Sequence, residues 1–330
     1  MRSWKRSHLK IGTSVTSNRG LPAFASEVDL SHCPEQGCAL QACNTLARGI
    51  ESVIVKRRVK RAYAARHTWR LATAPVRTLP DFLVIGAQKC GTTFLYQLLV
   101  QHPRVKPAFV KEIHYFDLNF RKGTNWYRSH FPLQLRNTRT YITGEASPYY
   151  LFHPHAAKRA SMVVPDAKLL ILLRNPVDRA YSHYQHQAKS VPEKARETLT
   201  FEEAIEAEDR ILPAEVGKML QDEYYQSPSH RTRSYLSRGI YIDQLLVWSS
   251  FFPRRRMLAL KSEDLFDDTT NALRRVLDFL EIPHWTPEAY SIPNKSEYTG
   301  VDPFVRRRLD KYYEPYNQRL YDYLGLDFGW

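Results

Sequence analysis

One segment, DFLVIGAQKCGTTFLYQLL, constrains the fold more than any other part of the chain. The apolar run at residues 82–85 predicts a buried strand, and the helical spacing of apolar residues afterwards predicts a helix near residues 92–101. Between them Gly86 and Gly91 permit a tight turn and the close approach of a phosphate. A strand, a glycine loop and a helix in this order direct backbone N–H groups and the positive helix end at one point. The segment therefore predicts an anion-binding loop.

This loop differs from the phosphate loop of nucleotide triphosphatases. That motif, G-x-x-x-x-G-K-[ST], places lysine directly after the second glycine, whereas Thr92 stands there and Lys89 lies inside the loop. At this position the ammonium group can reach the bridging oxygen between a phosphate and a sulfate, and Thr92 and Thr93 can add hydroxyl donors. The best candidate for a metal-binding strand, residues 168–173, ends in Arg174 rather than in an aspartate that would hold Mg²⁺. We therefore expect a metal-free anion transfer.

Short apolar runs alternate with amphipathic stretches after residue 80, which predicts an α/β fold with a parallel sheet flanked by helices. The expected strands are 82–85, 140–143, 168–173 and 257–261. The expected helices lie near 92–101, 154–162, 176–188, 200–209, 239–251, 269–281 and 303–324. We expect one catalytic domain at 79–330, preceded by a basic tail at 1–78 that is partly disordered or helical. Residues 189–238 are expected to form either an acceptor-side flap or a surface helical excursion.

The positive charge is concentrated in the tail. Of the net +14, residues 1–80 contribute +10, from fourteen Lys and Arg against four Asp and Glu, which leaves +4 for residues 81–330. Because the folded part has this small excess and no recognised module, we expect no nucleic-acid partner. The basic helical pattern that begins at Leu46 fits a helix on an anionic membrane, a targeting segment or a solvated helix.

The sequence gives no sign of a membrane span, a secretory signal or a metal site. Apolar runs stay far below the roughly 18 residues of a transmembrane helix, and no apolar stretch follows the basic start. The spacing of Cys33, Cys38 and Cys43 lacks the tight pairs and the fourth ligand of a zinc site. We therefore expect a cytoplasmic protein without a metal, with peripheral membrane contact through the tail as an open possibility.

A second anion site is predicted in KLLILLRNPVDRAYSHYQHQ. Its strand delivers Arg174 to the carboxyl end, and a guanidinium is a fixed fork suited to phosphate. Ser182 follows about two turns into the helix that begins at Pro176. From the residues alone, Arg174 could instead pair with Asp178 at i,i+4.

A third polar group lies between these two segments, in VKEIHYFDLNFRKGTNWYRSHFP. It comprises Lys111, Glu112, His114 and Asp117. If the aromatic residues among them pack around a cleft, these polar side chains meet at its mouth. A carboxylate beside apolar rings has a route to a raised pKa, which suits a general base. The alternative is a surface carboxylate that pairs with Lys111 or Arg121.

The first two segments resemble the 5′-phosphosulfate and 3′-phosphate motifs of the sulfotransferase superfamily. The resemblance implies the sulfotransferase fold and 3′-phosphoadenosine 5′-phosphosulfate (PAPS) as the sulfuryl donor, with 3′-phosphoadenosine 5′-phosphate (PAP) as the product. It also implies that two sets of residues bind the donor. The 5′ set is Lys89, Cys90, Gly91, Thr92 and Thr93, and the 3′ set is Arg174 and Ser182.

The third segment is similar to the K-E-x-H-[FY]-F-D pattern of heparan-type and bacterial carbohydrate sulfotransferases, in which the glutamate is the catalytic base. This implies Glu112 as the base, with Lys89 and His114 also catalytic and with Lys111 and Asp117 on the acceptor side. The R-K-G-x-x-G-D-W-K-like segment of small-molecule sulfotransferases has no counterpart near the C-terminus.

Two departures from the vertebrate heparan enzymes bear on the acceptor. Ala146 stands where some relatives place a substrate-contacting lysine, and residues 294–296 replace a nucleotide loop flanked by paired cysteines. We therefore expect a bacterial-type glycan or a glycolipid as the acceptor. A small-molecule alcohol or phenol sulfotransferase, a phosphate-loop kinase or ATPase, and a non-catalytic binding protein remain the alternatives.

Overall fold

The computed structural model describes residues 64–134, 140–288, 290 and 300–330. Tyr63–Trp330 form one compact unit. The predicted tail helix, the three tail cysteines and residues 294–296 lie outside the described residues. Among the residues that are described, no helix is long and apolar enough to cross a membrane.

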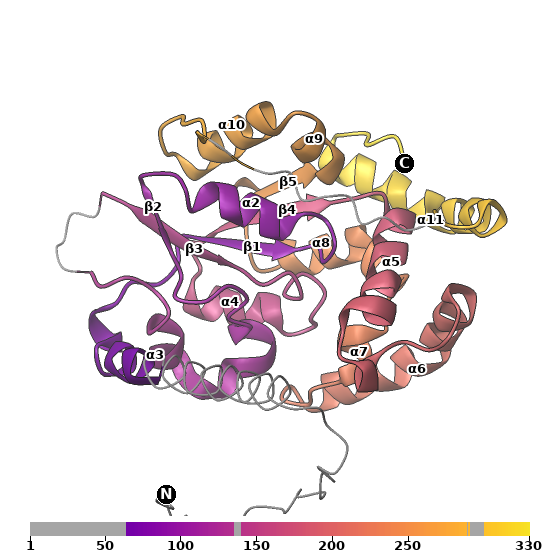
Figure 1. Ribbon diagram of the computed structural model, residues 1–330, viewed down its shortest axis with the longest axis horizontal. Coiled ribbons are helices and arrows are strands. Elements are labelled where there is room, and N and C mark those ends of the chain that lie inside the picture. Colours follow the sequence, from indigo (N-terminus) through magenta and orange to yellow (C-terminus); the bar gives the residue numbers. More distant parts are fainter. Residues whose placement is uncertain (1–63, 135–139, 289, 291–299) are drawn as a thin grey trace, which may run out of the picture. The chain divides into compact units, whose positions relative to one another are not determined.

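The core is a five-stranded parallel sheet with the strand order β2-β3-β1-β4-β5 (Figure 1). The strands are β1 (Phe82–Gly86), β2 (Val105–Pro107), β3 (Ile142–Ala146), β4 (Lys168–Leu173) and β5 (Met257–Lys261). The chain builds β2 and β3 on one side of β1, then crosses to build β4 and β5 on the other. In such sheets ligands bind beyond the carboxyl ends of the strands, where the strand order reverses. The predicted α/β class with a parallel sheet is confirmed.

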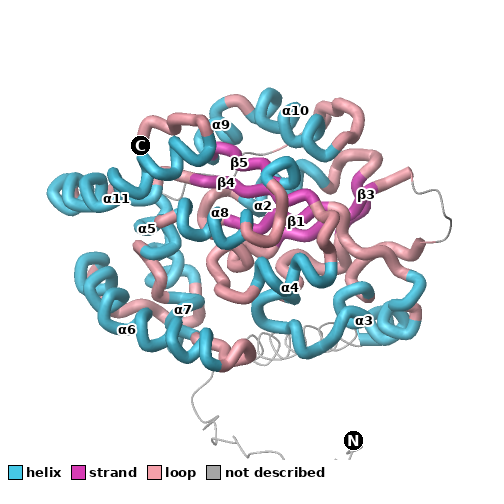
Figure 2. Tube along the Cα trace, turned by 180° about the vertical axis from the view of Figure 1, so that it is seen from behind, coloured by secondary structure: helices cyan, strands magenta, loops and turns pink. Residues whose placement is uncertain are grey.

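Helices cover the sheet and extend beyond one side of it. They are α2 (Thr92–Leu99), α3 (Gly123–Arg128), α4 (Ala156–Val163), α5 (Pro176–Gln185), α6 (Phe201–Gln221), α7 (Pro228–Thr232), α8 (Tyr241–Ser249), α9 (Ser262–Asp267), α10 (Thr269–Leu280) and α11 (Pro303–Leu324). In Figure 1, α2 crosses the sheet and α9 and α10 lie near β5. Figure 2 shows α5, α6 and α7 grouped beside the sheet, on the side away from β3.

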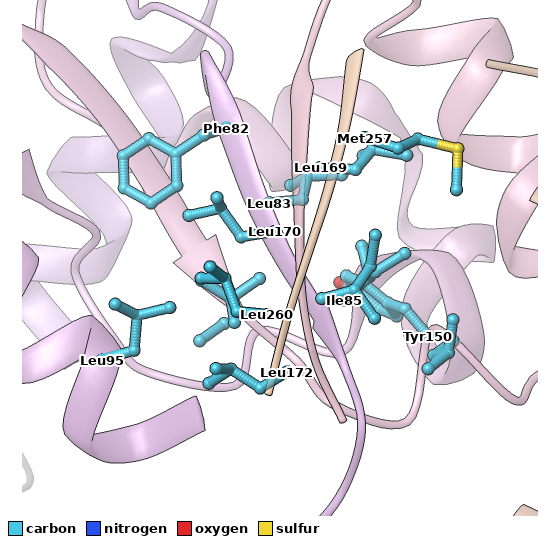
Figure 3. Packing of buried hydrophobic residues seen from close by; sticks show 14 of the residues in the cluster. Phe82, Leu83, Ile85, Leu95, Tyr150, Leu169, Leu170, Leu172, Met257 and Leu260 are labelled. Carbon is cyan, nitrogen blue, oxygen red and sulfur yellow. The ribbon is translucent and has the colours of Figure 1, made fainter. Parts of the chain in front are cut away.

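The two central strands are buried because helices cover both faces, which explains their continuous apolar runs. Every residue of β1 is buried, as are the last five of β4. Side chains alternate between the two faces: Phe82 lies on the same side as Leu95 of α2, and Ile85 lies on the side of Tyr150 (Figure 3). This packing holds the carboxyl ends of β1 and β4 side by side.

Several expected elements differ from those in the structure. The strand expected at 140–143 corresponds to β3, which runs from Ile142 to Ala146. Its end was missed because Gly144 and Glu145 interrupt the apolar pattern. The helix placed at 200–209 extends to Gln221, with Pro213 inside it. The sequence reading missed β2, α3, α7 and α9, each six residues or fewer, because such short elements carry too little periodicity.

The segment that precedes β1 packs on the domain. Residues 64–72 are helical, and Arg70 donates to the carbonyls of Ser129 at 2.6 Å and Phe131 at 2.8 Å. Arg77 donates to the same Phe131 carbonyl at 2.8 Å. The expected boundary between residues 78 and 79 stays a prediction, but these contacts favour Tyr63 as the place to shorten the chain.

Candidate active site

The β1–α2 loop, residues 86–91, ends in a helix whose first N–H groups have no side-chain cap. Gly91 precedes α2 with a φ of 85°, a conformation that favours glycine. A Cβ at this position would come within 2.9 Å of the Phe266 ring. Thr92 and Thr93 begin α2. The loop therefore has the open helix N-terminus that an anion needs.

Cationic side chains crowd around this loop. The pKa of Lys89 is lowered by burial, and Arg174 and Arg179 lower it further. Cys90 is fully buried, which raises the pKa of its thiol to about 11, so it packs as a neutral side chain. Mutual repulsion of the cations would be relieved by an anionic ligand, so the residues present fit a phosphosulfate group.

Arg174 follows β4 directly and faces the same loop. One of its guanidinium nitrogens lies 3.5 Å from the Lys89 carbonyl, a long contact, while its own carbonyl accepts from the Tyr241 hydroxyl at 2.8 Å. The predicted alternative, a pair with Asp178, does not form, because Asp178 binds Arg306 of α11. Ser182 is buried in α5, two turns beyond its start.

Two further arginines near the loop were not predicted. Arg179 is fully buried and donates to the Tyr235 carbonyl, while its Nε and Nη1 have no partner in the described part of the chain. Arg238 is 2% exposed and donates to the Gln88 side chain and, at 2.9 Å, to the His230 carbonyl. Burial lowers the pKa of Arg238 to about 9. Arg179 lies between the predicted donor residues Arg174 and Ser182 in the sequence, and this position is the signal that could have found it.

The Glu112 turn, defined as residues 111–117, brings four predicted residues together. Oε1 of Glu112 lies 2.6 Å from the Lys111 ammonium nitrogen, and Oε2 of Glu112 lies 3.5 Å from Nε2 of His114. His114 Nδ1 lies 2.7 Å from the buried Asp117 carboxylate. Glu112 and His114 have left-handed φ values of 59° and 52°. The side chain of Glu112 is 40% exposed. The pair with Lys111 that was the alternative expectation for a surface carboxylate therefore does form, and the same exposure lets an acceptor reach Glu112.

The pKa of Glu112 differs from the sequence-based expectation. We expected apolar rings to raise this pKa. Instead the hydrogen bond with His114 lowers the pKa of Glu112 to about 2. Lys111 lowers it further, and burial acts in the opposite direction. Burial acts to lower the pKa of His114, but the bonds with Asp117 and Glu112 outweigh it and raise this pKa to about 10. Glu112 is therefore ionised, and His114 protonated, throughout the neutral range.

His186 is a further titratable residue near the end of α5 that was not predicted. It caps α5, one turn after Ser182. Burial and Lys89 lower its pKa, whereas Glu112 raises it. In the described part of the chain, no cluster of three or more His, Cys, Asp or Glu residues could hold a metal ion.

Comparison with known proteins identifies the family. The profile of the Sulfotransferase domain family matches residues 79–297, which is more than half of the chain. The chain belongs to this family. Membership implies sulfuryl transfer with PAPS as the donor.

Curated relatives and solved structures agree with this assignment. Membrane-associated sulfotransferase kil1 of Dictyostelium discoideum is 28% identical to this chain. The match covers 76% of this chain and 66% of the relative's length. Human heparan sulfate glucosamine 3-O-sulfotransferase 3B1 is 30% identical over 77% of the chain and 65% of its own. The chain thus spans just under two thirds of each relative. The crystal structure of a sulfotransferase from Alicyclobacillus acidocaldarius is also similar, with 28% sequence identity and a TM-score of 0.57. The match covers 76% of this chain and 98% of the crystallised chain.

Proposed function

We propose that this sulfotransferase moves the sulfuryl group of PAPS to a hydroxyl or amino group of a glycan or glycolipid, with Glu112 as the general base. The observation that carries the proposal is an ionised, partly exposed carboxylate in a turn that is bonded to Ser147, directly after β3, while the cation-lined loop follows the neighbouring strand β1. A general base must be unprotonated and accessible to the acceptor, and Glu112 meets both conditions, although its lowered pKa makes it a weaker base than the raised pKa expected from the sequence would have done.

The donor would be held from both ends. Lys89, Cys90, Gly91, Thr92 and Thr93 would surround the 5′-phosphosulfate, with the N–H groups at the start of α2 as donors. The guanidinium of Arg174 and the hydroxyl of Ser182 would bind the 3′-phosphate. PAPS supplies an activated sulfuryl group, and no metal is required by this arrangement.

Transfer would be a direct in-line displacement. The acceptor oxygen or nitrogen forms a bond to sulfur while its proton passes to Glu112, and the bond from sulfur to the 5′-phosphate oxygen breaks with its electron pair on PAP. Lys89 would stabilise the charge on that leaving oxygen. By analogy with phosphoryl transfer the transition state is loose, so positioning and fixed donors supply most of the acceleration.

A carbohydrate acceptor is supported by the heparan sulfate relatives and by the Glu112 turn. Heparan sulfate itself is a poorer fit, because Ala146 is fully buried at the end of β3 and provides no cationic side chain. We therefore favour a different glycan or a glycolipid.

Radiolabelled PAPS offered with a panel of glycans, glycolipids, phenols and alcohols tests the proposal. We expect label in a glycan or glycolipid. Label only in phenols or alcohols would support the small-molecule alternative, and phosphate release from ATP and Mg²⁺ without any sulfuryl transfer would support the kinase or ATPase alternative. No transfer to any acceptor, despite tight PAP binding, would contradict an enzymatic role.

We also propose a cytoplasmic location and peripheral membrane contact through the basic tail. The charge of residues 1–80 and the name of the Dictyostelium relative support the membrane contact. Cell fractionation of the whole chain and of a chain that begins at Tyr63 tests both, since only the whole chain should appear with membranes.

A further inference from the structure

A buried carboxylate lies beneath the Glu112 turn. Glu145 of β3 is fully buried, and three hydroxyl groups donate to it: Ser147 at 2.7 Å, Tyr127 at 2.8 Å and Tyr150 at 2.9 Å. Within the described residues, no lysine or arginine forms an ion pair with it. Burial and the nearby Asp117 carboxylate raise the pKa of Glu145, while the three hydroxyl bonds act to lower it. Three hydroxyl donors on two oxygens match a carboxylate that only accepts.

Two of these hydroxyl groups continue to the backbone of the Glu112 turn. The Ser147 hydroxyl accepts from the His114 N–H at 3.1 Å, and the Tyr150 hydroxyl accepts from the Tyr115 N–H at 2.7 Å. Because each hydroxyl gives its hydrogen to Glu145, its lone pairs are free for these N–H groups. The carboxylate thus sets the direction of both hydrogen-bond chains.

The two bonded amides lie on either side of His114. Together they restrict the backbone rotation of this residue, which has a φ of 52° in the left-handed region that side chains disfavour. Its ring then aims Nδ1 at Asp117 and Nε2 at Glu112. The orientation of Glu112 therefore depends on the backbone conformation of its neighbour.

We propose that Glu145 is a positioning residue, which holds the catalytic base in place through Ser147, Tyr150 and the backbone of His114. The proposal rests on the proposed function, because it takes Glu112 as the base. Glu145 touches neither donor nor acceptor in this account; it acts only through the turn.

Tyr127 provides a matched control. Its hydroxyl is buried and donates to the same Oε1 as that of Tyr150, and its ring stacks on Tyr115 at 4.3 Å. No hydrogen bond links its hydroxyl to the backbone of the turn among the described residues. Tyr127→Phe therefore removes a buried bond to Glu145 and leaves both chains to the turn intact.

The experiment compares Ser147→Ala, Tyr150→Phe and Tyr127→Phe. It measures kcat with the best acceptor of the radiolabel panel, PAP affinity by calorimetry, and melting temperature. We expect Ser147→Ala and Tyr150→Phe to lower kcat by about 10–100-fold, the size of effect produced by a small misplacement of a catalytic group. PAP affinity should not change in any variant. Tyr127→Phe should lower the melting temperature, by about 2–4 °C, with kcat nearly unchanged.

The pH profile gives a second readout that a structural role would not affect. When the His114 ring is no longer held, the pKa of Glu112 should rise from about 2 toward its ordinary value. The acidic limb of kcat should then move to higher pH in Ser147→Ala and Tyr150→Phe but not in Tyr127→Phe. Each of these variants deletes one hydroxyl group and leaves the Glu145 carboxylate in place, so the test does not require a variant of the buried glutamate itself.

Two outcomes separate this proposal from the function on which it rests. If Glu112→Gln retains wild-type turnover, the base assignment itself is wrong. If Glu112→Gln is inactive, the base assignment stands. The positioning role of Glu145 is then refuted when all three hydroxyl variants change kcat by the same factor, or when none of them changes it.

Discussion

Replacing Arg174 with alanine should remove most of the preference for PAP over 5′-AMP. Within the described residues, the guanidinium of Arg174 makes one hydrogen bond, a long one of 3.5 Å to the Lys89 carbonyl, while Tyr241 and Glu263 fix the backbone around it. Arg174→Ala should therefore leave the loop in place and remove only the anion contact. A hydrogen bond to a charged group contributes about 1.5–3 kcal/mol, so two bonds from the guanidinium fork contribute at least about 3 kcal/mol. This corresponds to roughly 100-fold in PAP affinity.

Calorimetry with PAP and with 5′-AMP measures this effect directly. The wild-type protein should prefer PAP, and Arg174→Ala should lose most of that preference because 5′-AMP has no 3′-phosphate. Arg306→Ala is a matched control: it removes the same charge near α5, but this arginine binds Asp178. Equal wild-type affinity for the two nucleotides would refute the reasoning, and so would an Arg174→Ala variant that weakens both nucleotides alike.

The remaining predictions concern the tail and the pH dependence. A chain that begins at Tyr63 should keep turnover. A chain that begins at Leu79 should melt at a lower temperature than the Tyr63 chain, because it lacks the hydrogen bonds that residues 64–78 make with the domain. Equal melting temperatures of the two chains would contradict this. His114→Asn should let the pKa of Glu112 rise from about 2 toward its ordinary value, so the acidic limb of the kcat profile should move to higher pH. An unmoved limb would show that His114 does not hold this pKa down.

The parts of the fold that follow continuous patterns were predictable from the sequence. β1 and β4 are uninterrupted apolar runs, and the loop after β1 has a distinctive composition, so both strands and the loop were placed correctly. Glu145 was not found, because a buried carboxylate interrupts the pattern by which a strand is recognised. Its three partners come from residues 127–150 and meet only in the folded chain.

The candidate site was predictable in its residues but not in its electrostatics. The four polar residues of the Glu112 turn do meet, but the pKa of Glu112 is lowered rather than raised, because its adjacent cations act more strongly than burial. Arg179 and Arg238 were missed because charged residues are expected on the surface. Their burial depends on backbone carbonyls that sequence patterns do not reveal.

The central claim, that Glu112 is the base of a PAPS-dependent transfer, is tested most directly by comparing Glu112→Gln with Lys89→Ala. Glutamine keeps the size and some hydrogen bonding but cannot take the proton, so kcat should fall by about 10²–10⁴-fold while PAP affinity stays unchanged. Lys89→Ala should lower both kcat and PAP affinity, because the ammonium contacts the donor. If Glu112→Gln keeps near-normal turnover while His114→Ala abolishes it, His114 is the base and the account is wrong.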